Sequence, residues 1–340
     1  MTRGNPFVSW TSAILILGSL AAAQTYNITD LGGLAGSNNS EGQGVSKCGH
    51  VVGSGLVYGR HGFFWSEHGG MRDLELLHGG FNSEAMGINA SGEVAGYSDM
   101  NGGAPIHGVL WIQGKIHDLG ALPDGYLSQA TGINDSGEIV GFSDSSGNEP
   151  HAVFWHNHGR LQDLGVLPGG HYSQALAVNQ HNQVVGFSDN GGDDGWRAFS
   201  WTASAGMQDL GTLRDGGSAF ASSINNSGQI AGTSNNTAVA WSKGKKIESL
   251  GTLTGASWSA ASSINDRGEV VGYSGWRAFV WTTANGMQDL NKLIPRNSGW
   301  SLQFASGIND HGQITGYGMI KGQTHAFLLT RTDQPPWACK

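Results

Sequence analysis

The chain has 340 residues, 56 of them glycine, and only 13% of its residues are charged, with a formal net charge of −8 at pH 7. An acidic chain without a long Lys/Arg run is a poor partner for nucleic acid or for an anionic membrane surface, and we expect neither. The length allows two domains, but the repeat described below runs on without a linker and predicts one domain.

Residues 1–23 have the pattern of a secretory signal peptide. Arg3 gives a weakly basic start, residues 8–20 are mostly apolar, and residues 21–23 are alanines that form a small-residue cleavage site. The apolar stretch is too short to span a bilayer comfortably, and no second one follows, so we expect no membrane insertion after cleavage. The alternative is an uncleaved anchor. The expected product is a secreted or periplasmic protein.

From Asp30 onwards the chain repeats one pattern seven times, each copy opening on an Asp-Leu pair or its equivalent. The steps between copies are 40 to 46 residues long, which is the period of four-stranded propeller blades. The copies begin at Asp30, Asp73, Asp118, Asp163, Asp209, Ser249 and Asp289.

Within each copy, short alternating or apolar segments are bounded by turn residues, which predicts strands rather than helices. In the third copy we expect strand A at residues 128–134, strand B at 138–143, strand C at 151–155 and strand D at 160–167. No window after Gln24 keeps a helical apolar period, so the mature chain is predicted to be all β.

The number of strands predicts how the ring closes. Strands A, B and C each occur seven times, but strand D follows only six of the copies, and the last copy lacks one. The missing strand comes first in the sequence, at residues 26–32. A closed ring removes exposed sheet edges. We therefore predict a single seven-bladed β-propeller over residues 24–331, with four antiparallel strands per blade, an N-terminal strand that closes the last blade, and a tail at residues 332–340.

Recurrent small and aromatic residues are explained by packing within such blades. The A–B turn ends on glycine or on Asn182, which predicts a positive φ. Strand A carries a small residue, from Gly42 to Ala305, which we expect to line a crowded central channel. Strand B carries a glycine in every copy, which we expect to accommodate the indole that ends strand C. These indoles belong to Trp65, Trp111, Trp155, Trp201, Trp241 and Trp281. The alternative for them is a carbohydrate platform.

Cys48 and Cys339 are the two cysteines of the chain. In an exported protein an even number of cysteines favours a disulfide, and this one would connect the C-terminal tail with the first blade. The sequence leaves open whether the two Cα atoms come within bonding reach.

Strand C begins with His-Ala-Phe at His325 and with Arg-Ala-Phe at Arg197, and it occurs together with Ile-Asn-x-x-Gly-x-Val-Val-Gly and Asp-Leu-Gly-x-Leu. This combination resembles the bacterial extracellular HAF-repeat family, over all seven copies. The departures are mild: glycine follows His61 and His107 where the family has alanine, and Thr237 replaces the histidine. The resemblance implies an exported repeat protein and no established activity, so it assigns no catalytic residue.

Signals of enzymatic activity are weak. The His or Arg at the head of strand C recurs around the ring, whereas an active site occurs once, so we expect this residue to anchor the strand by a hydrogen bond. His156 and His158 form a His-x-His pair with no further ligand nearby in sequence, and we assign no metal site. The Asp-containing loops leave Ca²⁺ open as a cofactor, although they lack a regular series of ligands. No catalytic residue is assigned, and a binding protein is favoured over an enzyme.

Loops that differ between copies are expected on one face of the ring. In a four-stranded blade the B–C and D–A loops emerge together, and the nearly invariant A–B turns emerge on the other face. Variable loops on a rigid scaffold are where binding sites usually lie, and aromatic and acidic side chains suit a sugar or a peptide. The candidate ligand-binding residues are Phe81, Tyr126, Tyr172, Phe220, Trp258, Trp300, Asp99, Asp144 and Asp189. The alternative is that the aromatic side chains fold down between blades as loop anchors.

We therefore predict an exported, monomeric recognition or scaffold module that binds a glycan or an extracellular protein through its variable loops. A secreted hydrolase or lyase is one alternative, and it requires a non-repeated cluster of ionisable residues at the channel mouth. A purely structural envelope or matrix protein is the other, and it requires self-association or retention in the cell wall.

Overall fold

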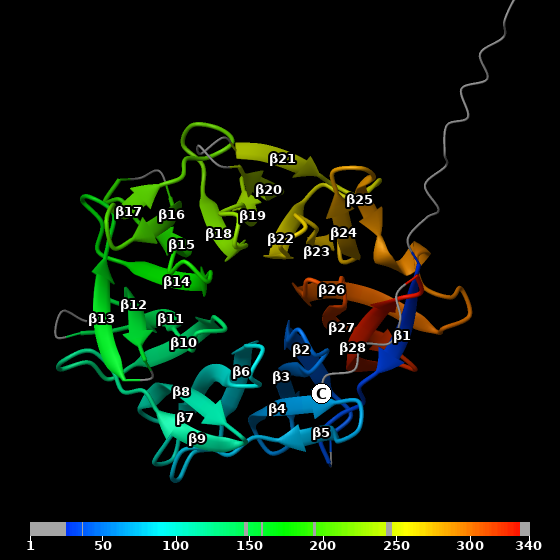
Figure 1. Cartoon of the computed structure of the whole chain (residues 1–340), viewed down its shortest axis with the longest axis horizontal. Helices are drawn as coiled ribbons and strands as arrows, with labels where there is room; N and C mark the ends of the chain where they lie inside the picture. Colours follow the sequence, from blue (N-terminus) through cyan, green and yellow to red (C-terminus); the bar gives the residue numbers. More distant parts are fainter. Residues whose placement is uncertain are drawn as a thin grey trace, which may run out of the picture.

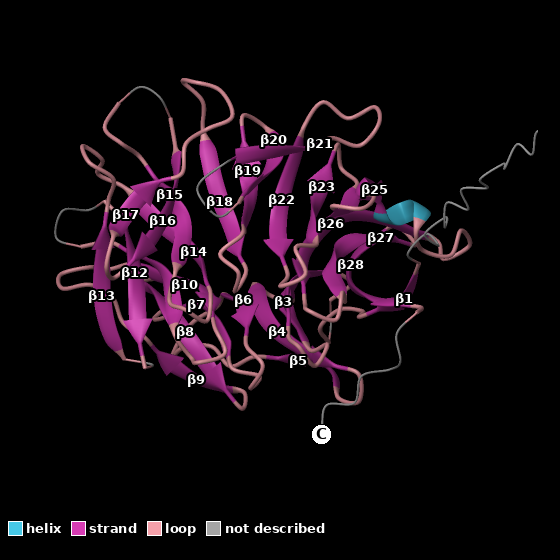
Figure 2. Ribbon diagram, turned by 45° about the horizontal axis from the view of Figure 1, so that its top comes forward, coloured by secondary structure: helices cyan, strands magenta, loops and turns pink. Residues whose placement is uncertain are grey.

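A computed structural model of the chain describes residues 25–35, 37–145, 149–157, 159–192, 195–242 and 247–333. Its strands form seven separate four-stranded antiparallel sheets, arranged as blades around a central channel (Figure 1). The tilted view in Figure 2 shows the same ring with its loops at the two rims. The prediction of an all-β, seven-bladed propeller is confirmed. The expected signal peptide at residues 1–23 lies outside the described residues.

The first blade contains β2 (Ser40–Val45), β3 (Val51–Leu56), β4 (Arg60–Ser66) and β5 (Gly70–Asp73). The second contains β6 (Ser83–Ile88), β7 (Val94–Asp99), β8 (Ile106–Ile112) and β9 (Lys115–Asp118). The third contains β10 (Ser128–Ile133), β11 (Ile139–Ser143), β12 (His151–His156) and β13 (Arg160–Gly165). The fourth contains β14 (Ser173–Val178), β15 (Val184–Ser188), β16 (Arg197–Thr202) and β17 (Gly206–Asp209).

The fifth blade contains β18 (Ala219–Ile224), β19 (Ile230–Ser234), β20 (Thr237–Trp241) and β21 (Ile247–Gly251). The sixth contains β22 (Ser259–Ile264), β23 (Val270–Ser274), β24 (Ala278–Thr282) and β25 (Gly286–Asp289). The seventh contains β26 (Trp300–Ile308), β27 (Ile314–Ile320), β28 (Gln323–Arg331) and β1 (Tyr26–Asp30). Among the described residues the one helix is the short 3₁₀ turn η1 (Leu290–Lys292), and none is long and apolar enough to cross a membrane.

The N-terminal strand closes the ring, as predicted. β1 pairs with β28 in antiparallel register, from Tyr26 opposite Arg331 to Asp30 opposite Phe327. In Figure 1 the blue β1 therefore lies beside the red β28. The ring of His325 also contacts the carboxylate of Asp30 at 2.8 Å. Both ends of the described chain thus share one sheet, in which β1 is the fourth strand and covers the edge of β28.

The hydrophobic core is divided into clusters that lie between neighbouring blades. One cluster joins Phe154 of the third blade to Phe199 and Trp201 of the fourth. The tryptophans that end strand C are placed the same way. The indole N–H groups of Trp111 and Trp155 donate to the carbonyl oxygens of Glu75 and Leu119 of the preceding blade, at 2.8 and 3.0 Å. These tryptophans hold neighbouring blades together, as the packing interpretation predicted.

The glycine of strand B is required chiefly by the backbone of strand A, which corrects the expected reason. A Cβ at Gly141 would overlap the carbonyl oxygen of Gln129 on the paired strand. The predicted indole is a second neighbour in two blades, where a Cβ at Gly96 or Gly232 would lie 2.9 or 3.0 Å from the tryptophan ring. This close approach follows from the bulge that each strand A forms beside the glycine, because the bulge brings the backbones of strands A and B together.

Except for Ala261 in the sixth blade, the small residue of strand A does not border the channel cavity, contrary to expectation. Ala130, for example, is fully buried between blades. The bulge that follows it turns the next two residues, Thr131 and Gly132, towards the channel instead. In every blade, the residue two positions after this small residue borders the channel. These residues are Gly44, Gly87, Gly132, Ala177, Ser223, Ser263 and Gly307.

The A–B turns form a polar ring that links one blade to the next. The last turn residue has positive φ in every blade, including +58° at Asn182, as predicted. In each turn but the first, an asparagine at the end of strand A accepts turn N–H groups and donates to the next blade. Asn134, for example, donates from Nδ2 to the carbonyl oxygen of Asn179 at 3.0 Å. Ser46 occupies this position in the first blade and has no amide to donate.

Asn134→Ala is expected to lower the free energy of unfolding by about 1–3 kcal/mol, because it removes a donor to the next blade and leaves buried turn groups unpaired. Ser46→Ala is the matched control, since Ser46 Oγ accepts the equivalent turn N–H groups of Cys48 and His50, but a serine has no amide to donate to the turn carbonyl of the next blade. Urea unfolding of both variants measures the difference. Equal losses would show that the bond between blades contributes nothing.

Candidate functional site

A cavity of about 1210 Å³ occupies the central channel. At one end it is bordered by the aliphatic residues that end strand A, among them Val45, Ile133 and Ile224. The same side chains border a more polar cavity of about 380 Å³ on the side of the A–B turns. A girdle of β-branched side chains therefore separates the two, and the large cavity opens towards the B–C and D–A loops, here called the loop face.

The lining of the large cavity is uncharged. Among the described residues that border it, none is Asp, Glu, Lys, Arg or His. Hydroxyl groups are contributed by residues such as Ser222, Ser262 and Ser306, and amides by Gln43 and Asn236. Most of the hydroxyl and aromatic lining comes from blades five to seven. This part of the wall can exchange hydrogen bonds and make apolar contacts, but it offers no ion pair.

Aromatic side chains continue from the cavity onto the loop face, in two connected groups that we call the aromatic rim. In blades six and seven, Trp258 lies 5.6 Å from Tyr273 and 5.4 Å from Trp276 between ring centroids, and Phe304 lies 4.7 Å from Tyr317. Edge-to-face and offset pairs of this kind are favourable for aromatic rings. The second group, in blades four and five, consists of Tyr172, Phe187, Trp196 and Phe220.

The rim tyrosines are neutral hydrogen-bonding groups at physiological pH. Burial, followed by the nearby carboxylate of Glu41, raises the pKa of Tyr317 to about 12. Burial also raises the pKa of Tyr273. Both hydroxyls can therefore donate to a ligand oxygen without becoming charged.

A charged cluster occupies the adjoining part of the loop face, in the first two blades. Arg60 Nη1 lies 3.3 Å from Glu41 and 3.4 Å from Glu84, and it donates to Ser54 at 2.8 Å. The hydroxyl of Tyr97 donates to Glu84 at 2.7 Å. Burial lowers the pKa of Arg60, but the carboxylates of Glu84 and Glu41 together outweigh it and raise the value overall. No other blade repeats this set of residues.

The predicted aromatic residues have three different locations. Phe220 and Trp258 border the large cavity, and Tyr172 belongs to the rim. Phe81 and Tyr126 are 61% and 60% exposed on the loop face, and neither borders the cavity. Trp300 does not reach it either, because it packs against the core at 6.0 Å from the ring of Phe327.

Strand alternation explains these locations. Successive side chains of a strand point to opposite sides, and the buried residue that begins strand A is the reference. Phe220 follows this residue and Trp258 precedes it, so both point to the channel side. Phe81, Tyr126 and Trp300 each stand two positions before it and point elsewhere.

The predicted acidic residues stabilise loops. The carboxylate of Asp99 accepts the backbone N–H groups of Phe81 and Asn82 at 2.6 and 2.8 Å. Asp144 and Asp189 accept the corresponding groups of the next two D–A loops, including Tyr126 N–H at 2.7 Å and Tyr172 N–H at 2.8 Å. These bonds hold the backbone under the aromatic residues. Within the described ranges, no group of three or more His, Cys, Asp or Glu side chains could hold a metal ion.

The His or Arg at the head of strand C anchors strand D, as predicted. His107 contacts the carboxylate of Asp118 at 2.9 Å, and Arg197 forms the equivalent ion pair with Asp209 at 2.9 Å. Burial raises the pKa of Asp118, but the hydrogen bonds from His107 and from the Gly120 N–H outweigh this effect and lower the pKa overall. The fifth blade lacks both members, with Thr237 and Ser249 in their places. This paired replacement identifies the contact as part of the blade.

Two other predictions involve residues beyond the described ranges. Cys339 and His158 lie outside them, so the disulfide with Cys48 stays a prediction. His156 contacts Gln162 at 2.8 Å and stacks on Phe154, an arrangement that serves the blade.

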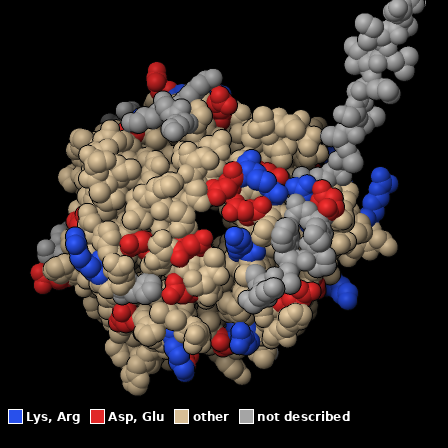
Figure 3. All heavy atoms as spheres, in the orientation of Figure 1, with Lys and Arg blue, Asp and Glu red and all other residues tan. Residues whose placement is uncertain are grey.

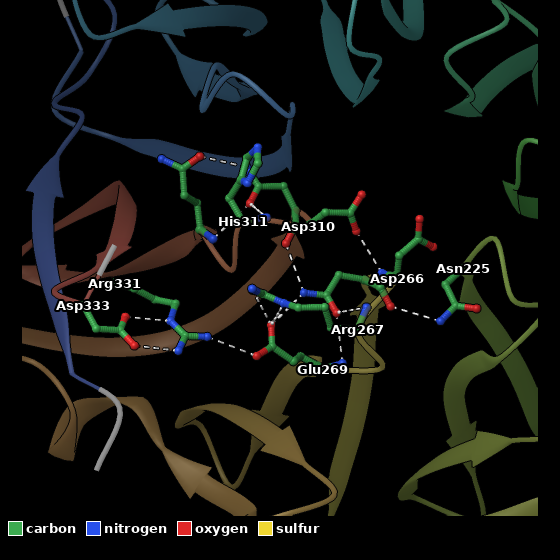
Figure 4. Close-up of polar contacts among 11 residues, drawn as sticks. Asn225, Asp266, Arg267, Glu269, Asp310, His311, Arg331 and Asp333 are labelled. Carbon is green, nitrogen blue, oxygen red and sulfur yellow. Dashed lines mark hydrogen bonds and ion pairs between the residues drawn. The ribbon is translucent and has the colours of Figure 1, made fainter. Parts of the chain in front are cut away.

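Acidic and basic side chains also gather next to the central opening on the face shown in Figure 3. One network of such residues lies at the A–B turn of the sixth blade (Figure 4). Glu269 pairs with Arg267 at 2.9 Å and with Arg331, at the end of β28, at 3.4 Å. Arg331 also pairs with Asp333 at 2.9 Å. The network connects the sixth blade to the closing blade, which is a structural role.

Several residues of the candidate site were missed by the sequence analysis, namely Phe187, Trp196, Tyr273, Trp276, Phe304 and Tyr317. Two positions in the repeat could have revealed part of this set. Tyr273 and Tyr317 directly follow the glycine of strand B, and Phe304 directly precedes the buried alanine of strand A. Trp276 has no such signal, because its B–C loop is shortened.

Comparison with solved structures supports the fold. A virginiamycin B lyase from Staphylococcus aureus, solved with quinupristin, is 13% identical with a TM-score of 0.56, covering 90% of this chain and 99% of its own. A puromycin-hydrolysing peptidase from Mycobacterium tuberculosis is 10% identical with a TM-score of 0.59, covering 87% of this chain and 51% of its own. An oligogalacturonate lyase in complex with manganese is 11% identical with a TM-score of 0.52, covering 91% and 97%.

No protein-family model matches the chain, and no curated protein resembles it in sequence. At these identities the solved structures share the propeller fold, and their activities are not transferred to this chain.

Proposed function

We propose that this protein is an exported recognition module that binds a glycan or an extracellular protein at the loop-face end of its central channel. The supporting observation is the large cavity, which is uncharged, continuous with the aromatic rim, and bordered below by the aliphatic girdle. A concave apolar surface with a few convergent polar groups on a rigid scaffold is a common form of binding site. Phe220 and Trp258 are the predicted ligand-binding residues that this proposal retains.

Export is part of the same proposal. It rests on the signal-peptide pattern of residues 1–23 and on the resemblance to extracellular HAF repeats, which both point to a secreted or periplasmic location.

A secreted hydrolase or lyase is the second candidate, and one observation favours it. The cluster of Glu41, Arg60, Glu84 and Tyr97 is non-repeated and ionisable, as this alternative requires. General acid–base catalysis needs such groups near the substrate. Burial and Glu84 raise the pKa of Tyr97, so its hydroxyl stays protonated at neutral pH and is a weaker acid than an ordinary phenol. None of these four residues borders the cavity, although Glu84 accepts a hydrogen bond from Gln43 of its wall, and binding is therefore the better-supported function.

The two functions are separated by a thermal-shift screen of residues 24–340 against polysaccharides and purified cell-envelope proteins. A ligand at about 100 times its Kd stabilises the folded state by about 2.7 kcal/mol, which raises the melting temperature measurably. We expect Phe220→Ala with Trp258→Ala to abolish this shift, because both side chains border the cavity. Tyr126→Ala is the control, since Tyr126 is similarly aromatic but lies outside the cavity.

A ligand whose shift survives the double substitution would place binding elsewhere and contradict the proposal. Turnover of a bound polysaccharide that is lost in Glu84→Gln while binding persists would establish the enzymatic alternative instead.

A further inference from the structure

We propose that the ligand is a neutral carbohydrate and that Trp276 is the side chain on which one of its rings stacks. This inference rests on the proposed binding function and specifies the ligand class of the same site. It is carried by the backbone of Trp276, by the placement of its indole, and by the chemistry of the cavity next to it.

Trp276 lies in a two-residue turn whose backbone disfavours it. Ser274 and Arg277 exchange two backbone hydrogen bonds, and Gly275 and Trp276 between them have φ of +54° and +64°. Large L side chains rarely adopt positive φ, and such strain is concentrated at functional sites.

The fifth blade provides the comparison. Its equivalent turn has Asn235 and Asn236 at φ of +49° and +60°, and asparagine tolerates this conformation well. The fold of the turn thus requires no tryptophan at position 276.

Burial does not account for Trp276 either. The side chain is 64% exposed, in contrast to the tryptophans that end strand C, most of which are buried. Its ring makes nearly perpendicular contacts with Trp258, at 5.4 Å and 86°, and with Phe304, at 5.7 Å and 77°. These contacts orient the indole beside the cavity while most of its surface stays open to solvent. An oriented, exposed indole is suited to stack on the apolar face of a sugar ring.

The neighbouring cavity favours a neutral, hydroxyl-rich ligand over a charged one. Trp258, Tyr273 and Tyr317 border it together with several serines, and no charged side chain does among the described lining residues. A peptide would bring backbone amides and charged side chains, for which the wall has no ionic partner. Sugar hydroxyls can pair with the serine and tyrosine hydroxyls.

The charged cluster that adjoins the cavity wall argues against an acidic sugar. Glu41 and Glu84 share the single guanidinium of Arg60, so these three groups have a net negative charge. Arg60 is already engaged by both carboxylates and by Ser54. An approaching carboxylated polysaccharide would therefore be repelled rather than paired.

Trp276→Asn tests the inference, because it removes the stacking surface and places a residue that suits the backbone. The probes are the neutral polysaccharides laminarin, mannan and cello-oligosaccharides, with polygalacturonate and alginate as acidic counterparts. We expect binding of at least one neutral probe and of neither acidic probe. We expect Trp276→Asn to weaken the neutral binding about tenfold or more, with an unchanged or higher melting temperature. Tyr126→Asn, outside the cavity, is the matched control and should bind normally.

The outcomes separate this inference from the function on which it rests. Equal binding by Trp276→Asn and the parent chain overturns the role of Trp276. Preference for an acidic probe, or failure of every neutral probe, overturns the ligand class. A protein ligand whose binding is lost in the Phe220 and Trp258 double variant would then leave the binding module standing without the carbohydrate.

Discussion

Trp155→Ala is expected to lower the free energy of unfolding by about 3–5 kcal/mol, the range for truncating a large buried aromatic residue. Trp155 is fully buried between the second and third blades. Its indole N–H donates to the carbonyl oxygen of Leu119 at 3.0 Å. The substitution therefore leaves both a cavity and an unpaired buried carbonyl, and neighbouring backbone constrains how far the blades can close the gap. Urea unfolding followed by tryptophan fluorescence or circular dichroism measures the loss.

The sixth blade offers a matched control. Trp281 ends strand C at the same repeat position, but it is only half-buried. Trp281→Ala should therefore cost clearly less than Trp155→Ala, since less apolar surface returns to water. If both variants lose the same stability, burial between blades is not the reason for the indole that recurs at the end of strand C.

Removal of the closing strand is expected to abolish cooperative folding. A chain that begins at Gly33 lacks β1, and with it the partner of β28, the buried Tyr26 and the contact between His325 and Asp30. The last blade then exposes a sheet edge, which is a site for pairing with other chains. We expect aggregation or association on size-exclusion chromatography and loss of the cooperative thermal transition. A chain that begins at Gln24 is the control.

Addition of a synthetic peptide of residues 25–33 extends this experiment. Because β1 contributes to one sheet only, the peptide should restore at least part of the transition when it binds beside β28. A truncated chain that remains monomeric, with an unchanged melting temperature, would refute the role of β1 in closing the ring.

The functional argument depends on how two parts of one surface differ. Blades one and two bring charged residues to the loop face, whereas blades four to seven bring aromatic ones. Both sets stand on equivalent strands, since Glu84 pairs with Tyr97 in the second blade as Phe304 pairs with Tyr317 in the seventh. The repeat therefore supplies a uniform scaffold, and the residues at these few positions determine which ligand chemistry each sector can accept.

The sequence by itself determined the architecture of this protein, because its signals are local and repeated. The period of the copies, the strand D at residues 26–32 and the Gly or Asn182 that ends each A–B turn predicted blade number, closure and turn conformation. Each of these features depends on side-chain alternation or backbone conformation within a few neighbouring residues, so it can be predicted from the sequence directly. The anchoring role of the His or Arg before strand C was predicted for the same reason.

Only the tertiary structure decided which side chains meet at the candidate site. The bulge of strand A directs Thr131 and Gly132 rather than Ala130 to the channel. Trp258 borders the cavity and Trp300 packs on the core, although their positions relative to the start of strand A differ by only one residue. Trp276 joins Phe304 of the next blade although 28 residues separate them in the chain (304 minus 276). Such contacts depend on register and on the angle between blades. These are properties of the closed ring that no single copy of the repeat encodes.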